Sequence, residues 1–347
     1  MFYNFKDFDK KIAVILENGK KISYFDILLN HKKIRKFFPR KRSLFFLEAS
    51  LTEEFVILYS YLLINKHPIL ILDSNVKKDE LNVLIKKFRP NYILLNSSEL
   101  TNTMYLSQIS FQKYRLFISK KQKKIELNTK LSILLPTSGS TSKIKYVRCS
   151  LQNLLSNTRS IVDYLKISSS SRTVTSLPLN YVYGLSILNT HLYAGGSIIF
   201  CNKSIIQKKF WSVIKKFKCN NLNFVPYTYE LINRIGKLKS LFSLRLRFLT
   251  SAGDNLEPFI IEKIKHFNKN KIPFFRMYGQ AEATSRISYV PPNYFDEPNC
   301  IGIPIPGGKI SIDSKSKSQI IYKGKNVTLG YAKSYLDLKK GDENNGI

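Results

Sequence analysis

Small hydroxyl residues, glycine and lysine are concentrated in one short segment, residues 134–145, with the sequence LLPTSGSTSKIK. The apolar run 131–135 predicts a strand before this loop, and 151–165 predicts a helix after it. Small residues let backbone N–H groups approach an anion closely, and hydroxyls add further donors. A lysine about 4 Å from a phosphate oxygen near a surface adds roughly 4 kcal/mol of attraction. The loop is therefore predicted to cradle phosphates, with the charge supplied by Lys145. The residues expected to supply the donors are Thr137, Ser138, Gly139, Ser140 and Thr141.

A flexible Ser/Thr-rich linker is the other interpretation of this loop, and composition alone would favour it. The strand and helix predicted on either side argue for an anchored loop instead. The loop lacks the Gly-Lys-Ser/Thr ending of a P-loop. It also lacks the G-x-S-x-G turn that would make Ser138 or Ser140 a hydrolase nucleophile.

Length and composition narrow the class of protein. The 347 residues suffice for about two domains or one large α/β unit, and 44% of them are apolar. No apolar segment of a secretory signal follows the N-terminus, and the longest apolar run, 55–65, is shorter than the ~20 residues of a membrane helix. Four dispersed cysteines show no metal-binding spacing. We therefore expect a cytoplasmic protein with free thiols and no membrane insertion.

The net charge of +32 arises from 56 Lys and Arg against 24 Asp and Glu. Basic runs occur at 31–36, 39–42 and 120–124, but most of the excess is lysine spread along the whole chain. No nucleic-acid-binding fingerprint is present, so we expect no nucleic-acid partner. An RNA-associated protein is an alternative, and it predicts RNA binding with a steep salt dependence. A basic surface also favours anionic ligands such as ATP, CoA or a phosphorylated carrier.

Predicted strands and helices alternate along most of the chain. Apolar runs that predict strands occupy 12–16, 22–24, 68–72, 91–95, 197–200 and 221–225, and helical patterns occupy 53–65 and 210–217. Such alternation predicts an α/β fold with mainly parallel sheets covered on both faces. After about residue 291, Pro, Gly and Asn become frequent and short β segments follow. This change predicts a smaller β subdomain.

The loop and five later segments resemble, in order, the motifs of the adenylate-forming (AMP-binding) superfamily, which includes acyl-CoA synthetases, peptide-synthetase adenylation domains and luciferases. Residues 137–145 are similar to the family loop T-S-G-S-T-G-x-P-K-G. The other segments are SLPLNYVYGL (176–185), RFLTSAGD (247–254), MYGQAE (277–282), GIPIPGG (302–308) and GKNVTLGY (324–331). Six matches in the family order are far more specific than any one of them.

The resemblance implies roles for residues in these segments. Lys145 and the hydroxyl loop would hold the phosphates of ATP, and Glu282 would hold the Mg²⁺ that bridges them. The nucleotide would lie against Ser251, Ala252, Gly253, Tyr278, Gly279 and Gln280. The acyl pocket would be lined by Asn180, Tyr181, Tyr183, Gly184, Val225 and Pro226. Each of these residues also has a simpler structural interpretation. The glutamate could stabilise the start of a helix, the glycines could form turns, and the tyrosines could pack in the core.

The resemblance also implies an architecture. The chain, 1–347, would be the large N-terminal domain of an adenylate-forming enzyme, with α/β subdomains at approximately 1–170 and 171–292 and a small distorted β-barrel subdomain at 293–347. Relatives continue into a C-terminal domain that carries a catalytic lysine, and the motifs of that domain do not occur before Ile347. We therefore expect a chain truncated before that domain, with a separate chain as its possible source.

Four positions depart from the family motifs. Ser142 and Tyr146 replace glycines, Ile144 replaces a proline, and Ala281 lacks a hydroxyl that relatives direct at a phosphate. If position 142 requires a positive φ, serine there costs roughly 1–2 kcal/mol.

The resemblance predicts an ATP-dependent ligase that activates a small carboxylic acid as an acyl-adenylate. CoA, the phosphopantetheine of a carrier protein, or an amine would accept the acyl group. The alternative is a catalytically inactive remnant, or a binding module, that retains the nucleotide and acyl pocket.

Overall fold

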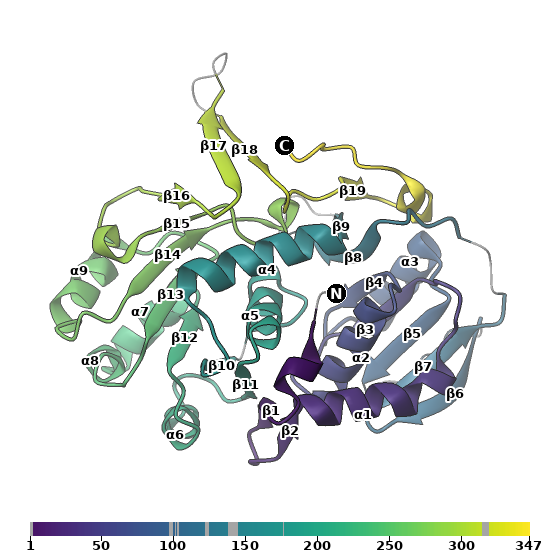
Figure 1. Ribbon diagram of the computed structural model, residues 1–347, viewed down its shortest axis with the longest axis horizontal. Helices are drawn as coiled ribbons and strands as arrows, with labels where there is room; N and C mark the ends of the chain where they lie inside the picture. Colours follow the sequence, from purple (N-terminus) through teal and green to yellow (C-terminus); the bar gives the residue numbers. More distant parts are fainter. Residues whose placement is uncertain are drawn as a thin grey trace.

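The computed structural model describes residues 3–96, 100, 102, 104–121, 125–137, 145–175, 177–313 and 319–347 of the 347-residue chain. Two large sheets, with helices between and outside them, make up most of the molecule (Figure 1). This arrangement confirms the predicted α/β fold.

The first sheet, sheet A, is parallel except at its two edges. Its strands are β1 Ile12–Leu16, β2 Lys21–Ser23, β10 Arg172–Thr175, β11 Ser197–Phe200, β12 Asn221–Phe224, β13 Phe248–Ala252, β14 Phe274–Tyr278, β15 Ser288–Val290 and β16 Ile303–Pro304. Their order is β16-β15-β14-β13-β12-β10-β11-β1-β2. Every pair from β14 to β1 is parallel, and β2, β15 and β16 are antiparallel additions.

The second sheet, sheet B, has a parallel centre and antiparallel flanks. Its strands are β3 Phe45–Glu48, β4 Ile69–Leu72, β5 Tyr92–Asn96, β6 Tyr105–Phe111, β7 Tyr114–Ser119, β8 Leu131–Pro136, β9 Tyr146–Ser150 and β19 Tyr331–Ala332. The order is β19-β9-β8-β4-β3-β5-β7-β6. Only the run from β8 to β5 is parallel.

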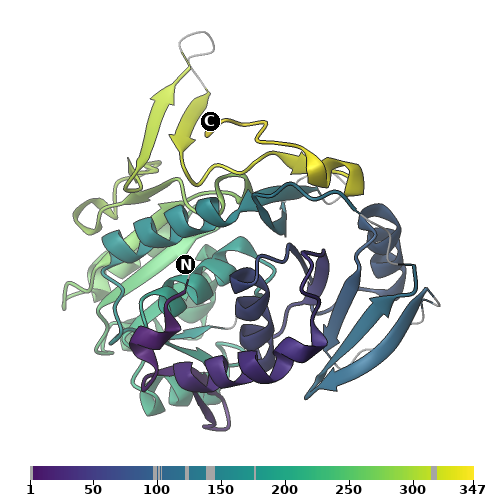
Figure 2. The same cartoon turned by 45° about the vertical axis from the view of Figure 1, so that its right-hand side comes forward.

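Helices form layers between and outside the sheets (Figures 1 and 2). The central layer, whose apolar side chains share one core with both sheets, contains α1 Tyr24–Ile34, α2 Glu53–Ile64, α4 Leu151–Leu165 and α5 Val182–Tyr193. The outer face of sheet A is covered by α6 Lys208–Lys216, α7 Pro226–Arg234, α8 Leu238–Leu241 and α9 Pro258–Phe267. The outer face of sheet B is covered by α3 Lys78–Phe88.

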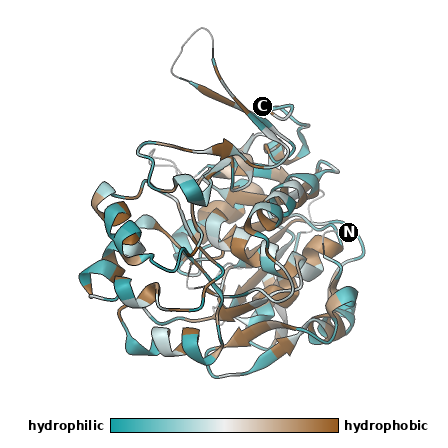
Figure 3. Cartoon of the chain, turned by 60° about the vertical axis from the view of Figure 1, so that its left-hand side comes forward, coloured by the Kyte–Doolittle hydropathy of each residue, from teal (hydrophilic) through white to brown (hydrophobic). Residues whose placement is uncertain are grey.

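Local sequence explains these layers. Helix α2 is buried on nearly every side because it lies between two sheets, and its sequence is correspondingly apolar all round. Helix α4 begins at Ser150, whose hydroxyl accepts from the Asn153 backbone while the Asn153 side chain accepts from the Ser150 backbone. On the outer helices, hydrophilic and hydrophobic residues alternate along the ribbon (Figure 3), as expected for elements with one face in solvent.

The predicted small β segments form a two-stranded antiparallel sheet of β17 Gly308–Ile312 and β18 Ile320–Gly324. This hairpin projects from the body of the molecule (Figure 1), while β16 and β19 join the edges of the two large sheets. The N-terminal strands β1 and β2 belong to sheet A, although they precede all of sheet B in the chain. The subdomain boundaries at 170 and 292 stay a prediction. Within the described residues, no helix is both long and apolar enough to cross a membrane.

Candidate nucleotide- and acyl-binding site

The carboxyl ends of β13 and β14 open onto a cavity of about 480 Å³. Four of the predicted nucleotide-binding residues line it: Ser251, Gly253, Tyr278 and Gly279. The carboxyl edge of a parallel sheet is where α/β folds generally bind ligands. The sequence motifs therefore meet where the topology places a site.

The hydroxyl of Ser251 is buried and unpaired in the described structure. The residue is 3% exposed, and its Oγ has no hydrogen-bond partner among the described residues. Gly253 lies beside it with φ +105°, and a Cβ there would come 2.5 Å from the Tyr181 hydroxyl and 3.6 Å from Val225 Cγ1. An unused buried hydroxyl next to a position that admits only glycine fits a site shaped around a bound group.

Arg276, which the sequence did not single out, also lines this cavity and is the neighbour of Ser251 across strands β13 and β14. Its guanidinium donates to the carbonyl oxygens of Phe295 at 2.9 Å, Glu297 at 2.6 Å and Cys300 at 3.3 Å. Cys300 also lines the cavity. The arginine follows the apolar strand residues Phe274 and Phe275, and no local pattern indicates that its side chain would hold a loop about 20 residues away.

Two predicted acyl-pocket segments lie at the topological switch point of sheet A. After β10 the chain continues to β11 on one side, and after β11 it crosses to β12 on the other. Tyr181 follows β10, Val225 and Pro226 follow β12, and the contacts at Gly253 show that Tyr181 and Val225 are close together. Such switch points form crevices at the strand ends. The Asn180 side chain donates to Asp73 at 2.8 Å and so links this edge to sheet B.

Tyr183 and Gly184 lie in the first turn of α5 and face the core. The Tyr183 hydroxyl is 2.6 Å from Thr250 Oγ1, and the Arg286 guanidinium carbon lies 4.3 Å from the centre of its ring. Burial raises the pKa of Tyr183 to about 12, so its phenol is neutral at physiological pH. A Cβ on Gly184 would come 2.2 Å from the Pro178 carbonyl oxygen. The structure thus shows packing contacts for both residues.

The remaining predicted contacts differ in exposure. Ala252 is 2% exposed within β13, and Pro226 is buried at the first position of α7. Gln280 is exposed and precedes the 3-10 turn Ala281–Ala283. At Gly279 a Cβ would come 1.9 Å from the Ser285 carbonyl oxygen, so this turn requires glycine for its close backbone approach.

The base of the predicted phosphate loop is a strand hairpin. The Thr137 N–H donates to the Lys145 carbonyl at 2.9 Å, and β8 pairs with β9 immediately below. The loop therefore joins two antiparallel strands, and α4 begins only after β9. Predicted donors Ser138, Gly139, Ser140 and Thr141, with the departures Ser142 and Ile144, lie outside the described residues, and their arrangement stays a prediction. Tyr146, the third departure, is 4% exposed in β9, where its ring packs edge-on to Phe88.

Lys145 and Glu282 meet around Tyr331, another residue to which the sequence assigned no role. The Tyr331 hydroxyl donates to Glu282 Oε1 at 2.9 Å, and Lys145 Nζ lies 5.9 Å from the centre of the Tyr331 ring. Burial, together with this hydrogen bond, raises the pKa of Tyr331 to about 12. Because Tyr278 and Glu282 share one short turn, this charged cluster and the cavity are parts of the same region.

The donor set is compatible with magnesium carried by a nucleotide. Glu282 presents one hard carboxylate, and no group of three or more His, Cys, Asp or Glu that could hold a metal occurs in the described part of the chain. Magnesium characteristically uses one or two protein carboxylates and completes its shell with substrate phosphates and water. Ala281, the fourth departure, is 6% exposed, so its side chain packs in the core.

The structure is that of an α/β protein with a cavity at the carboxyl edge of a parallel sheet. The AMP-binding enzyme family matches residues 54–332, and the chain therefore belongs to that family.

The chain is similar to known CoA ligases at low sequence identity. Oxalate–CoA ligase of Arabidopsis thaliana is 28% identical over 225 residues, which are 61% of this chain and 43% of that protein. The 2-succinylbenzoate–CoA ligase of Lactococcus lactis is 24% identical over 272 residues, which are 77% of this chain and 57% of that protein. The crystal structure of apo MatB from Rhodopseudomonas palustris superimposes with a TM-score of 0.77 at 20% identity, covering 94% of this chain and 69% of MatB. That similarity confirms the fold of the N-terminal domain of adenylate-forming enzymes. The chain spans less than two thirds of the curated relatives that it matches.

Proposed function

We propose that this chain binds ATP and a carboxylic acid and serves the formation of an acyl-adenylate. A carboxylate oxygen attacks the α-phosphorus of ATP, the bond to the bridging oxygen of the β-phosphate breaks, and pyrophosphate leaves. The thiol of CoA or of a carrier-protein phosphopantetheine, or an amine, then attacks the acyl carbon and releases AMP. Mg²⁺, held by Glu282 and the phosphates, would offset the negative charge of the nucleotide.

The observation that carries the proposal is the turn from Tyr278 to Glu282. Its first residues line the cavity beside Ser251, and its last residue accepts a hydrogen bond from the hydroxyl of Tyr331, whose ring centre lies 5.9 Å from Lys145 Nζ. In the proposed complex the adenosine lies against Ser251, Gly253 and Tyr278. The phosphates extend toward Lys145 and the adjoining loop.

For the acid, we propose a small polar or aromatic carboxylate. Tyr181 and Asn180 bring a hydroxyl and an amide to the switch-point crevice, and Asn180 Oδ1 is buried with no hydrogen-bond partner among the described residues. Burying an amide oxygen against a long alkyl chain would be unfavourable. The relatives described above are ligases for oxalate and 2-succinylbenzoate, both small acids.

Lys145→Ala tests the phosphate-binding part of the proposal. Removing the charge should weaken ATP and pyrophosphate binding by at least about tenfold, equivalent to roughly 1.4 kcal/mol. The affinity for AMP should fall less, because AMP has no β- or γ-phosphate for the lysine to contact. Isothermal calorimetry measures all three affinities. Lys130→Ala, an exposed lysine just before β8, is the matched control. Unchanged ATP affinity in Lys145→Ala would remove Lys145 from the site.

A catalytically inactive binding module is the second candidate, favoured by the altered motif positions Ser142 and Ile144 in the loop and Ala281 in the later turn. ATP–pyrophosphate exchange with candidate acids separates the two functions. The exchange should be measured for this chain alone and with the C-terminal domain of a relative added. Exchange in either case supports the ligase. Nucleotide binding without any exchange supports the binding module.

A further inference from the structure

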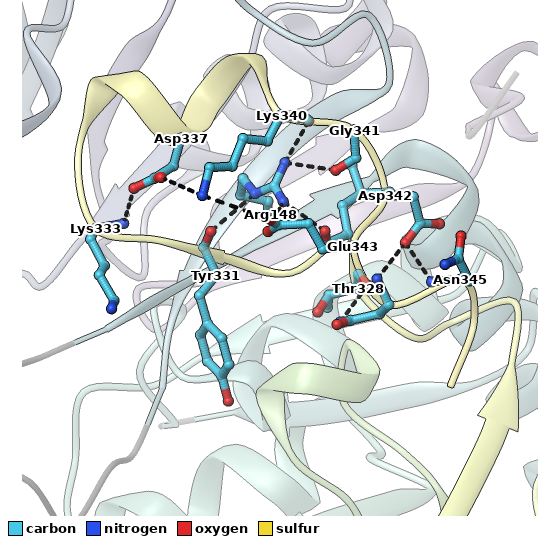
Figure 4. Close-up of polar contacts among 12 residues, drawn as sticks. Arg148, Thr328, Tyr331, Lys333, Asp337, Lys340, Gly341, Asp342, Glu343 and Asn345 are labelled. Atoms are coloured by element: carbon cyan, nitrogen blue, oxygen red, sulfur yellow. Dashed lines mark hydrogen bonds and ion pairs between the residues drawn. The ribbon is translucent and has the colours of Figure 1, made fainter.

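Arg148, in the middle of β9, is a fully buried arginine whose side chain binds a distant segment of the chain (Figure 4). All its side-chain nitrogens donate to backbone carbonyls of residues 329–341. The distances are 3.1 Å from Nε to Tyr331, 2.6 and 3.0 Å from Nη1 to Lys340 and Gly341, and 2.7 Å from Nη2 to Leu329. We call residues 329–343 the anchored segment.

The charge of Arg148 also has a partner in this segment. Nη2 forms an ion pair with Glu343 Oε2 at 2.6 Å, and Lys340 Nζ lies 3.4 Å from the other oxygen of the same carboxylate. A buried guanidinium without acceptors would be strongly unfavourable, so the position is tolerable only because the segment supplies them. The arginine and the segment therefore require each other.

Gly330 allows the backbone to pass directly over the guanidinium. Its φ is +113°, and a Cβ there would come 2.6 Å from Glu343 Oε2 and 2.9 Å from Arg148 Nη2. The backbones are joined as well, since the Arg148 N–H donates to Gly330 at 2.8 Å and the Leu329 N–H donates to Arg148 at 2.7 Å. The residue after this glycine is Tyr331.

We propose that Arg148 is a positioning residue for the phosphate-binding end of the site. By fixing the anchored segment against β9, it holds the Tyr331 hydroxyl on Glu282 and the Tyr331 ring beside Lys145. The inference rests on the proposed function of Lys145 and Glu282. None of the hydrogen bonds that the Arg148 side chain makes in the described structure goes to β13 or β14, which carry the residues proposed for adenosine. Replacing Arg148 should therefore weaken the binding of MgATP and leave the binding of AMP unchanged.

Arg148→Lys and Tyr331→Phe test this assignment. Lysine keeps the charge but cannot span the carbonyls that the planar guanidinium reaches. In each variant, calorimetry should show MgATP affinity reduced by about tenfold, typical of a lost hydrogen bond to a charged group, and AMP affinity within about twofold of wild type. The double variant should lose little more than either single one, because both changes disturb one chain of contacts.

Arg42→Lys is the matched control. Arg42 also donates to three backbone carbonyls, those of Lys66, Leu127 and Leu131, but Leu131 is at the end of β8 away from the loop. This variant should lose stability without a selective loss of MgATP affinity. An equal loss for AMP and MgATP in Arg148→Lys, or full MgATP affinity in Tyr331→Phe, would overturn the positioning role.

Hydrogen exchange separates this inference from the proposed function. In Arg148→Lys without ligand, amides of the anchored segment should exchange faster, while those of β13 and β14 keep their protection. Unchanged exchange in residues 329–343 would overturn the anchoring. If the wild-type chain bound neither nucleotide, the proposed function would fail and the positioning role with it, whereas faster exchange would still establish the anchor.

Discussion

Gly253 shows how a single residue can shape a site. A methyl group there would lie 2.5 Å from the Tyr181 hydroxyl, on a backbone with φ +105°. Two effects are therefore combined at one position: backbone strain and loss of room between the nucleotide cavity and the switch-point crevice.

Gly253→Ala should destabilise the protein by about 1–3 kcal/mol and also weaken ligand binding, because strain and steric overlap act together. Thermal unfolding and ATP calorimetry measure the two effects. Gly19→Ala is the control, since Gly19 has φ +95° with nothing within 4 Å of an added Cβ. The Gly19→Ala variant should lose stability without losing ATP affinity. ATP affinity equal to wild type in Gly253→Ala would show that the cavity does not extend to this glycine.

At the residue scale, the sequence predicted the parts of the site that follow directly from strand ends. Ser251, Gly253 and Tyr278 lie together because they close neighbouring parallel strands. Tyr331 and Arg148 could not be assigned in the same way, because the Arg148–Tyr331 contact joins residues 183 positions apart. The orientation of Tyr183 was equally hidden, since a tyrosine in the first turn of a helix can face either a pocket or the core.

At the element scale, continuous apolar runs located strands β1, β4, β8 and β11, and the pattern of residues 151–165 gave the bounds of α4. Strand β9 escaped prediction because its sequence, YVRCS, carries a charged residue at the centre. That residue is Arg148, which is buried only because a distant segment accepts its hydrogen bonds. A local pattern cannot show such compensation.

Helix α5 carries a buried histidine that is part of its packing. His191 Nδ1 lies 2.9 Å from the Ile187 carbonyl, and Nε2 lies 3.2 Å from Asn221 Nδ2. With the proton on Nδ1, the ring donates to the helix and accepts from Asn221. Burial lowers the pKa of His191 to about 4.

The free energy of unfolding should therefore fall as the pH decreases from about 6.5 to 4. In this window His191 is protonated in the unfolded chain but stays neutral in the folded protein. Acid therefore favours the unfolded state. A shift of this size corresponds to about 3 kcal/mol once the pH is below both pKa values. Burial lowers the pKa of His31 and His67 to about 4 as well, so the three contributions add.

Urea unfolding at pH 7 and pH 5 measures this dependence. The variant His191→Gln keeps a polar side chain without a titrating proton, and its stability should change less between the two pH values than that of wild type. An identical pH dependence in both proteins would show that His191 does not contribute.

At the scale of the whole molecule, the net charge of +32 should make stability depend on salt. Repulsion among like charges opposes the compact state, and ions screen it over about 10 Å at 0.1 M. Raising NaCl from 20 to 200 mM should increase Tm, by roughly 1–2 °C for each 1 kcal/mol of repulsion removed from a chain of this length. KCl should act equally if screening is the cause. A decrease of Tm with salt would indicate that ion pairs outweigh the repulsion.

The α/β class of the whole molecule followed from alternating strand and helix patterns, but the assignment of strands to sheets did not. The N-terminal strands β1 and β2 join sheet A, the chain then builds sheet B, returns to complete sheet A, and adds β19 to sheet B. Sequence periodicity reports which residues are apolar on a face. It contains no information on which of two similar sheets a strand will enter.

This crossing of the chain has a consequence during translation. Val14 of β1 pairs with Ile198 of β11, so the first strand leaves the ribosome long before its parallel neighbour exists. At about 5–20 residues per second, the wait is on the order of 10–40 s. Throughout that time an apolar edge is open to wrong partners, and a nascent chain arrested before residue 197 should depend on chaperones to stay unaggregated.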